Sequence, residues 1–175
     1  AQRIPASPSA LACCARVSMA SLAPLPATTP ALQWSKSEGE LRLVTLRLED
    51  LADLQNPNAV VVKVSFAGVC GSDLHVLDGQ LETSEKLILG HEFSGVVAFV
   101  GKNVRHVRVG DKVVVDPNEG CHRCGYCWCG RINHCQHGSL KATIGLVRNG
   151  GMAGYCVVPD TVVHHLPEGL PLAAA

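Results

Sequence analysis

The chain has 175 residues, 47% of them hydrophobic, and its 15 basic and 15 acidic residues balance to a formal net charge of zero. This length and apolar content fit one globular domain with its own core and exclude a disordered chain. The balanced charge, and the lack of an apolar run long enough to cross a bilayer, argue against nucleic acid or a membrane as partner and favour a small-molecule ligand.

The first part of the chain differs in composition from the rest. Five of the ten prolines lie in residues 1–30, and the first acidic residue is Glu38. Such a segment has little to bury, so we expect residues 1–30 to form a disordered or non-native leader. Residues 31–175 are expected to form the domain.

Two interpretations of the start remain open. The chain begins with Ala, and Met19 lies just ahead of the first strand pattern, so residues 1–18 could be upstream translation. Arg3 and Arg16, with several serines and no acidic residue, also fit a mitochondrial transit peptide. Nine cysteines, an odd number with metal-site spacing, indicate a reducing compartment. We therefore expect a cytoplasmic protein, with a mitochondrial location as the alternative.

From Leu32 onward the pattern predicts a β-rich domain. Leu41 and Leu43, and then Leu46 and Leu48, alternate with polar residues, but the phase slips between the two pairs. A bulge or bend would produce such a slip, so we expect two short strands or one kinked strand.

Further strands follow, separated by Gly, Pro, Asn and Asp. Val60–Phe66 has valines at alternate positions and leads directly toward Cys70. No segment shows convincing helical periodicity, so the spacing predicts an all-β barrel or sandwich. The remaining candidate strands are Phe93–Val100, Lys112–Asp116, Tyr155–Val158 and Thr161–Leu166.

One short stretch concentrates side chains with metal and proton chemistry: Cys70, Ser72, Asp73, His75, His91 and Glu92. Taken singly, a cysteine is most often a small buried hydrophobe and a loop histidine is usually solvated. Together, a thiolate and an imidazole are ligands that zinc prefers, and catalytic zinc keeps three protein ligands and one open position. Cys70, His91 and Glu92 could supply those three ligands.

A second group of cysteines has the spacing of a closed metal site: Cys121, Cys124, Cys127 and Cys135. Four thiolates complete a tetrahedral zinc shell with no open position, which predicts a structural site. A disulfide-bonded loop is the less favoured alternative. Cys129 could replace Cys127, but the even spacing of the first three cysteines favours Cys127.

The sequence has no Gly-x-Gly-x-x-Gly motif after a strand. Gly150–Gly154 is rich in glycine but lacks that spacing and leads into a strand pattern. We interpret it as a flexible turn.

Three motifs together carry a family resemblance. They are Gly68-Val-Cys70-Gly-Ser72-Asp73-Leu-His75, Gly90-His91-Glu92-Phe-Ser-Gly95, and the four-cysteine group. With these motifs the chain resembles the zinc-dependent medium-chain alcohol and polyol dehydrogenases, from about Leu32 to Ala175. It is more similar to the sorbitol, threonine and butanediol dehydrogenase branch.

The resemblance implies a mainly β fold, a GroES-like β-barrel carrying a four-cysteine zinc lobe. In that family a Rossmann domain, which binds NAD or NADP, normally follows. No such domain is in this sequence, so we expect a C-terminally truncated catalytic domain that is inactive alone. The full-length protein is expected to be a homo-oligomer.

Ligand roles follow from the same resemblance. Cys70 and His91 would bind a catalytic zinc, and Glu92 would be either its third ligand or a partner of its ligands. The cysteines of the lobe would bind a structural zinc.

The resemblance also implies roles around the reacting oxygen. Ser72 would hydrogen-bond the substrate hydroxyl, His75 would lie on the proton relay to solvent, and Asp73 would orient a metal ligand. The expected reaction interconverts a secondary alcohol or polyol and its ketone by hydride transfer with NAD(P). The alternatives are a non-catalytic zinc-binding fragment that keeps only the structural lobe and, less favoured, a zinc-free quinone reductase-like enzyme of the same superfold.

Overall fold

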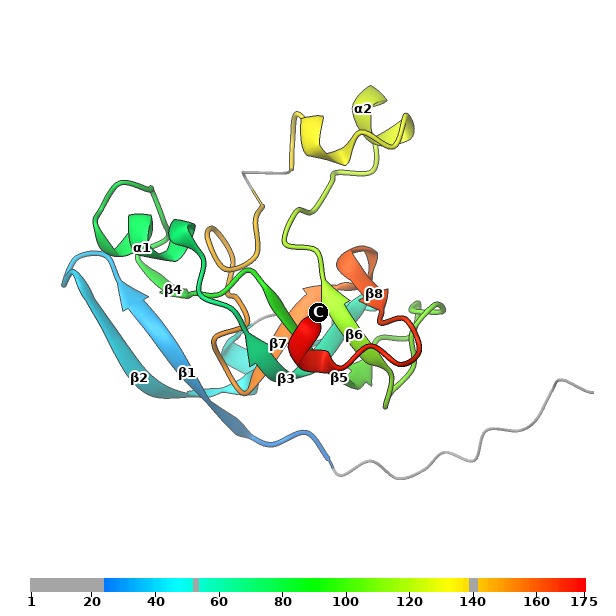
Figure 1. Cartoon of the computed structure of the whole chain (residues 1–175), viewed down its shortest axis with the longest axis horizontal. Coiled ribbons are helices and arrows are strands. Elements are labelled where there is room, and N and C mark those ends of the chain that lie inside the picture. The colour runs from blue at the N-terminus through cyan, green and yellow to red at the C-terminus, as the bar shows by residue number, and fades with distance from the viewer. Residues whose placement is uncertain (1–23, 52–53, 139–141) are drawn as a thin grey trace, which may run out of the picture.

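The computed structural model describes residues 24–51, 54–138 and 142–175. Within these ranges two antiparallel β-sheets form the body of the molecule, and a smaller lobe stands away from them (Figure 1). One sheet has the order β2-β1-β4, with β1 at Thr28–Ser35, β2 at Glu40–Arg47 and β4 at Lys86–Ile88. The other has the order β7-β3-β5-β6-β8, with β3 at Ala59–Ala67, β5 at Phe93–Val100, β6 at Lys112–Val115, β7 at Tyr155–Pro159 and β8 at Val163–His165.

The helical elements are short. The α-helices are α1 at Gly71–Leu77 and α2 at Gly125–Trp128. The 3₁₀ helices are η1 at Leu48–Asp50, η2 at Ile132–His134, η4 at Asp160–Val162 and η5 at Leu172–Ala174. Among the described residues, no helix is both long and apolar enough to span a membrane.

Valines on the strands build the main core. Val60 and Val62 of β3 pack with Val97 of β5 and Val113 of β6, and all four are almost completely buried. β-Branched side chains fit the pleated surface of a sheet, and burying each one contributes roughly 1.5 kcal/mol or more. Val61, on the opposite face of β3, is buried in a second cluster that includes residues of β1 and β4. β3 is thus buried on both faces over residues 59–62, whereas its last residues, which lead to Cys70, are largely exposed.

The predicted kink in the second strand is wrong. β2 is one regular strand whose register with β1 runs without a shift from Glu40 to Arg47. Leu41 and Leu43 lie on an exposed face, whereas Val44 is half-buried against the second cluster. The phase of the hydrophobic pattern changes because the apolar residues move from one face of the strand to the other. No residue is inserted into the strand.

The domain begins earlier than the composition indicates. β1 starts at Thr28, so residues 28–30 belong to the domain although we assigned them to the leader. Pro30 is compatible with this stretch because it lacks only the N–H donor, and its carbonyl still accepts from the Gly154 N–H at 2.9 Å. The interpretation of residues 1–18 as upstream translation lies outside the described residues.

The expectation of no helix is also wrong, because α1 follows Cys70 directly. Its seven residues make about two turns, too few for a hydrophobic period to be recognised. Asp73 fixes its start, since a carboxylate oxygen accepts a hydrogen bond from the Cys70 backbone N–H at 2.8 Å. An acidic side chain in the first turn also satisfies one of the backbone donors that a helix leaves free.

The segment Gly150–Gly154 is not a flexible turn. The Gly150 N–H donates to the Ile88 carbonyl at 2.8 Å, and the Gly151 N–H donates to the Gly90 carbonyl at 2.7 Å. Both glycines are buried. The segment therefore clamps the chain that leaves β4.

Candidate metal centres

Cys70 and His91 come from two parts of the chain that β3 and β5 bring together. The strands pair antiparallel, so the end of β3 lies beside the start of β5. The Gly68 N–H donates to the Glu92 carbonyl at 2.8 Å and closes this junction. As a result one ligand atom from each of Cys70, His91 and Glu92 lies within 4.8 Å of the others. The structure thus brings the three predicted residues of the open centre together.

The three side chains differ in exposure. His91 is buried, Cys70 is half-buried, and Glu92 is exposed. Gly68 leaves room for the carboxylate, because a Cβ at that position would lie 3.1 Å from the Glu92 Oε2 atom. A buried imidazole and a thiolate, with an accessible carboxylate, form a donor set that suits zinc.

A buried carboxylate stands behind the histidine. Asp73 is only 2% exposed, and its Oδ1 atom lies 3.6 Å from the His91 Nδ1 atom. Both atoms are buried without a hydrogen-bond partner. Buried polar atoms are normally paired. A small approach would let the Nδ1–H donate to Asp73 and leave the other ring nitrogen with its lone pair free for a metal, the usual arrangement of ligating histidines.

Ser72 and His75 lie beside this group on α1. The Ser72 Oγ atom is 3.8 Å from the Cys70 Sγ atom. His75 is three residues further along and exposed, so the two side chains share one side of the helix. The structure places Ser72 beside Cys70, and His75 one helical turn further along α1 in contact with solvent.

Sequence reasoning missed the residues that hold the His91 loop. Gly90 has a φ of 92°, and a Cβ there would lie 2.7 Å from the Met152 side chain, so only glycine fits. The Asn149 side chain accepts from the Ile88 N–H at 3.1 Å and donates to the Leu51 carbonyl at 3.3 Å. No local pattern reveals these contacts, because they join segments about sixty or more residues apart.

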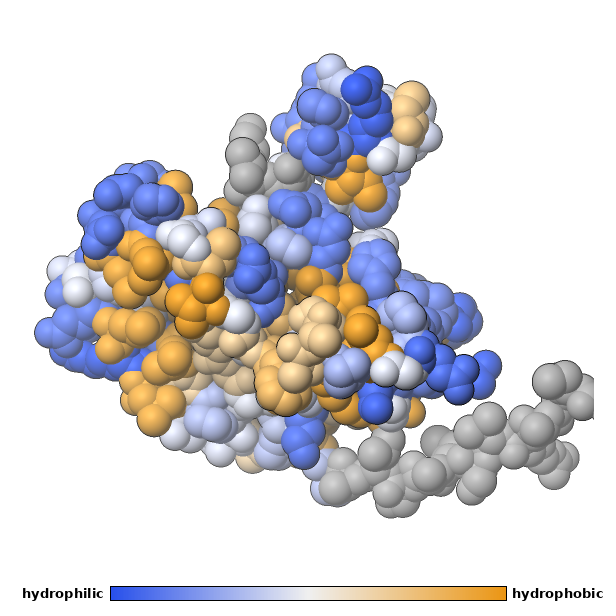
Figure 2. Space-filling view, in the orientation of Figure 1, coloured by the Kyte–Doolittle hydropathy of each residue, from blue (hydrophilic) through white to orange (hydrophobic). Residues whose placement is uncertain are grey.

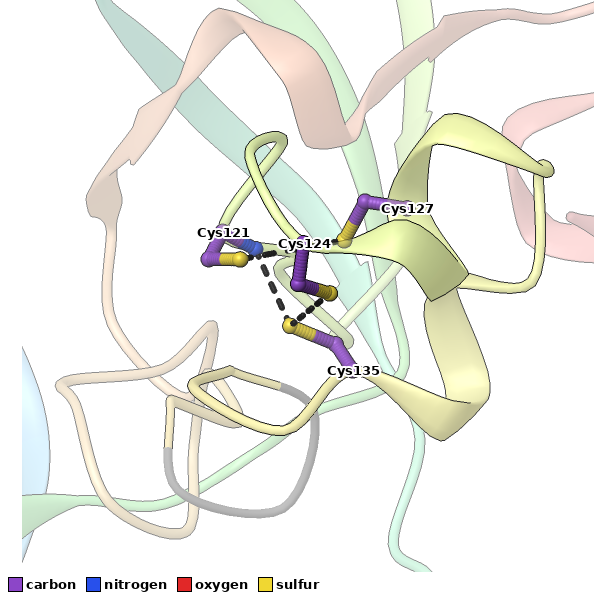
Figure 3. A group of neighbouring side chains, drawn as sticks. All are labelled: Cys121, Cys124, Cys127 and Cys135. Atoms are coloured by element: carbon purple, nitrogen blue, oxygen red, sulfur yellow. Dashed lines mark hydrogen bonds between the residues drawn. The ribbon is translucent and has the colours of Figure 1, made fainter.

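The other four predicted cysteines meet in the lobe, where their side chains point toward one another (Figure 3). All four sulfurs lie within 4.8 Å of one another. The Sγ atoms of Cys121 and Cys127 are 4.0 Å apart, and those of Cys124 and Cys135 are 3.9 Å apart. Tetrahedral zinc with bonds of 2.3 Å would separate its sulfurs by about 3.8 Å. The cluster therefore fits zinc closely.

Backbone N–H groups point at the sulfur of Cys135. Those of Cys121 and Gly138 donate to it, each at 3.2 Å. The Cys121 N–H is the main cause that lowers the pKa of Cys135 to about 6. The N–H of Cys127 likewise lowers the pKa of Cys124, whereas desolvation raises the pKa of Cys127 to about 11. N–H donors that favour the charged form of sulfur are what a thiolate ligand requires.

Cys129 is exposed and lies outside the group, which contains Cys127 instead. All cysteines of the described residues are free. The disulfide-bonded loop that we considered as the alternative for the lobe does not form in this structure.

Comparison with known proteins shows the family. The model of the alcohol dehydrogenase GroES-like domain matches residues 56–168. The chain belongs to this family. Its fold and two clusters of zinc-type ligands place it among the zinc-dependent medium-chain alcohol and polyol dehydrogenases, and the predicted GroES-like fold with a cysteine lobe is confirmed.

The relatives of this chain include enzymes that act on sugars and alcohols. D-xylulose reductase A of Aspergillus niger is 38% identical over 133 residues, which are 73% of this chain and 37% of that protein. A cobalt- and zinc-bound thermostable alcohol dehydrogenase from Pyrobaculum aerophilum superimposes with a TM-score of 0.71 at 31% identity, covering 83% of this chain and 43% of that one. Acetophenone reductase of Geotrichum candidum in complex with NAD superimposes with a TM-score of 0.75 at 26% identity, covering 86% of this chain and 43% of that one. The chain thus spans little more than a third of the length of the curated relatives it matches.

Proposed function

We propose that the domain carries the catalytic metal centre of a zinc-dependent oxidoreductase that interconverts a secondary alcohol or polyol and its ketone with NAD or NADP. The main support is the convergence of Cys70, His91 and Glu92 within 4.8 Å, backed by the buried carboxylate of Asp73. A structural site alone would not require an accessible set of three mixed ligands. The second cluster, in the lobe, is assigned to a structural zinc.

In this proposal Cys70, His91 and Glu92 hold the catalytic zinc. When bound there, zinc polarises the oxygen of an alcohol or ketone and lowers the pKa of a hydroxyl group by several units. Asp73 orients the His91 ring and, by accepting from the Cys70 N–H, also fixes the backbone of the thiolate ligand.

Ser72 and His75 manage the proton. The Ser72 hydroxyl lies 3.8 Å from the Cys70 sulfur, close enough to hydrogen-bond a substrate oxygen held at the same centre. His75 is exposed one helical turn away, and an imidazole ring can both accept and donate a proton. Together they provide a path from the substrate hydroxyl to solvent, the role of a general base and relay.

The nicotinamide cofactor needs a binding surface that the described residues do not form, since they contain no parallel sheet with a glycine-rich turn. We assign hydride transfer to the longer protein. The relatives favour sugars or other polyols as substrates, because D-xylulose reductase A is among the matches.

Metal substitution tests this function with the chain as it is. Cobalt(II) replaces zinc and reports its coordination by visible absorption. If the Cys70 centre is catalytic, D-xylulose should perturb the cobalt spectrum of the chain, and Cys70→Ala should abolish that response while retaining the bands of the four-cysteine site. A spectrum that D-xylulose leaves unchanged at saturating concentration would instead favour a zinc-binding module without substrate access.

A further inference from the structure

One loop touches the surroundings of both candidate metal centres. Residues 143–151, the connecting loop, follow the lobe in the chain and precede β7. The loop contains a tight turn, in which the Gly145 N–H donates to the Arg148 carbonyl at 2.7 Å and the Arg148 N–H donates to the Thr143 carbonyl at 3.2 Å. These hydrogen bonds hold Gly145 and Arg148 in a fixed relation, so the position of one depends on the position of the other.

One side of the connecting loop holds the backbone of His91. Gly145 has a φ of 78°, and a Cβ at this position would lie 2.7 Å from the His91 nitrogen, so only glycine allows this approach. The Gly151 N–H donates to the Gly90 carbonyl at 2.7 Å. The connecting loop therefore sets where the imidazole of the open centre lies.

The other side of the connecting loop reaches the lobe through one side chain. Arg148 forms an ion pair with Glu119, which lies two residues before Cys121. Gly138, where the chain leaves the lobe, packs so closely on the Glu119 carbonyl that no Cβ would fit between them. Arg148 thus binds the neck through which the chain enters and leaves the lobe. Figure 2 shows that this lobe stands away from the body and joins it through a narrow connection on the face shown.

A second contact between these segments does not depend on the lobe. The Ile144 N–H donates to the Pro117 carbonyl at 3.0 Å. Ile144 is only 1% exposed and belongs to the main core, so the core fixes this junction whether or not the lobe is ordered. Within the part of the chain that the structure describes, Arg148 has one salt bridge, the pair with Glu119. Its guanidinium is therefore the group through which a change in the lobe can act on the connecting loop.

The lobe has little besides its metal ligands to keep it ordered. Of residues 121–137, all of which the structure describes, Cys135 is the one that is buried. The helices of the lobe, α2 and η2, have four and three residues. A segment without an apolar core gains its order from the bound metal. Loss of that metal would release the neck, and with it the Glu119 carboxylate that Arg148 binds.

We propose that Arg148 is a positioning residue that couples the two metal centres, so that zinc in the lobe tightens zinc binding by Cys70 and His91. The proposal rests on the assignment of both centres to zinc in the proposed function. With the lobe loaded, the pair with Glu119 fixes the connecting loop against His91. With the lobe empty, zinc binding at the open centre must also order this loop, which costs affinity.

The contact sets the size of this coupling. The Arg148 and Glu119 side chains are 44% and 25% exposed, so their ion pair is worth about 1 kcal/mol or less, and the affinity of the open centre should change about two- to fivefold. Coupling between two binding sites is reciprocal. Zinc at the open centre should therefore raise the zinc affinity of the lobe by the same factor.

Cobalt(II) titration of the full chain tests the coupling, because visible absorption reports binding at the Cys70 centre. The titration compares a lobe loaded with zinc and a Cys121→Ser/Cys135→Ser lobe, each with Arg148 and with Arg148→Met. Disabling the lobe should weaken the Cys70 centre about two- to fivefold when Arg148 is present and should have no effect in Arg148→Met. An equal loss in both backgrounds, or no loss with Arg148 present, would overturn the proposal.

The reverse direction uses a chain whose lobe keeps all its ligands. The zinc affinity of the lobe, measured by chelator competition, should fall by the same factor in Cys70→Ala/His91→Ala, but not when Arg148→Met is also present. Arg148→Lys should restore part of the coupling, and Arg108→Met, at an exposed arginine between β5 and β6, should leave it intact. Two zinc ions that bind independently would refute the coupling and leave the proposed function standing, whereas a chain that binds one zinc would contradict both.

Discussion

Removing one charge behind the candidate catalytic centre should weaken its hold on zinc without unfolding the domain. Asp73→Asn keeps the size of the side chain, and its remaining oxygen can still accept from the Cys70 N–H, now 2.8 Å from Asp73 Oδ2. The other oxygen, which lies 3.6 Å from His91 Nδ1, is replaced by the NH₂ group of the amide. The substitution therefore replaces an acceptor for the imidazole N–H by a second donor.

The size of the effect follows from that contact. Carboxylates that orient a metal-ligating histidine typically account for a 10- to 100-fold difference in metal affinity. Asp73 is 2% exposed, so water cannot substitute for it. We expect Asp73→Asn to weaken zinc binding at this centre by about 10- to 100-fold, or about 1.4 to 2.7 kcal/mol.

Competition with a chromogenic chelator measures this affinity, and the zinc of the four-cysteine lobe serves as an internal reference. Asp78→Asn is the matched control, because Asp78 is exposed at the other end of α1. The reasoning is refuted if Asp73→Asn binds zinc as tightly as the wild type, or if the control loses as much affinity. Loss of both zincs would indicate unfolding, which circular dichroism detects.

Three further predictions concern other contacts. Gly68→Ala should weaken zinc binding at the same centre, since its Cβ would lie 3.1 Å from Glu92 Oε2; an unchanged chelator titration would remove Glu92 from the centre. Burial raises the pKa of the Cys156 thiol from 9.0 to about 12. Between pH 9.0 and about 12 this thiol therefore ionises in the unfolded chain but stays protonated in the folded chain. The free energy of unfolding should fall between these two pH values, and urea denaturation should show a smaller fall in Cys156→Ala. Arg148→Met removes the ion pair with Glu119 and, because both side chains are partly exposed, should cost about 1 kcal/mol or less in thermal unfolding.

Local patterns predicted the parts of the fold that depend on neighbouring residues. Phe93–Val100 was expected as a strand from its composition and is β5 with the same bounds. The lobe was predictable because Cys121 and Cys135 lie only fourteen residues apart and zinc dictates their spacing. In each case the information lies within one segment.

Other features depend on contacts between distant segments. β4 has only three residues, and it is a strand because it pairs with β1. The packed state of Gly150–Gly154 comes from hydrogen bonds to the chain around Gly90, about sixty residues away. The exposed face of β2, with Leu43, could not be recognised either, because periodicity indicates that a strand has an apolar face but not whether that face is covered.

The most direct test of the account is the zinc content of the folded chain, measured by elemental analysis on the wild type and on a Cys70→Ala/His91→Ala double variant. The account predicts two zinc ions per wild-type chain and one in the double variant, with the remaining ion lost in Cys135→Ser. One zinc in the wild type, unchanged by the double variant, would contradict the assignment of Cys70, His91 and Glu92 to a catalytic metal centre.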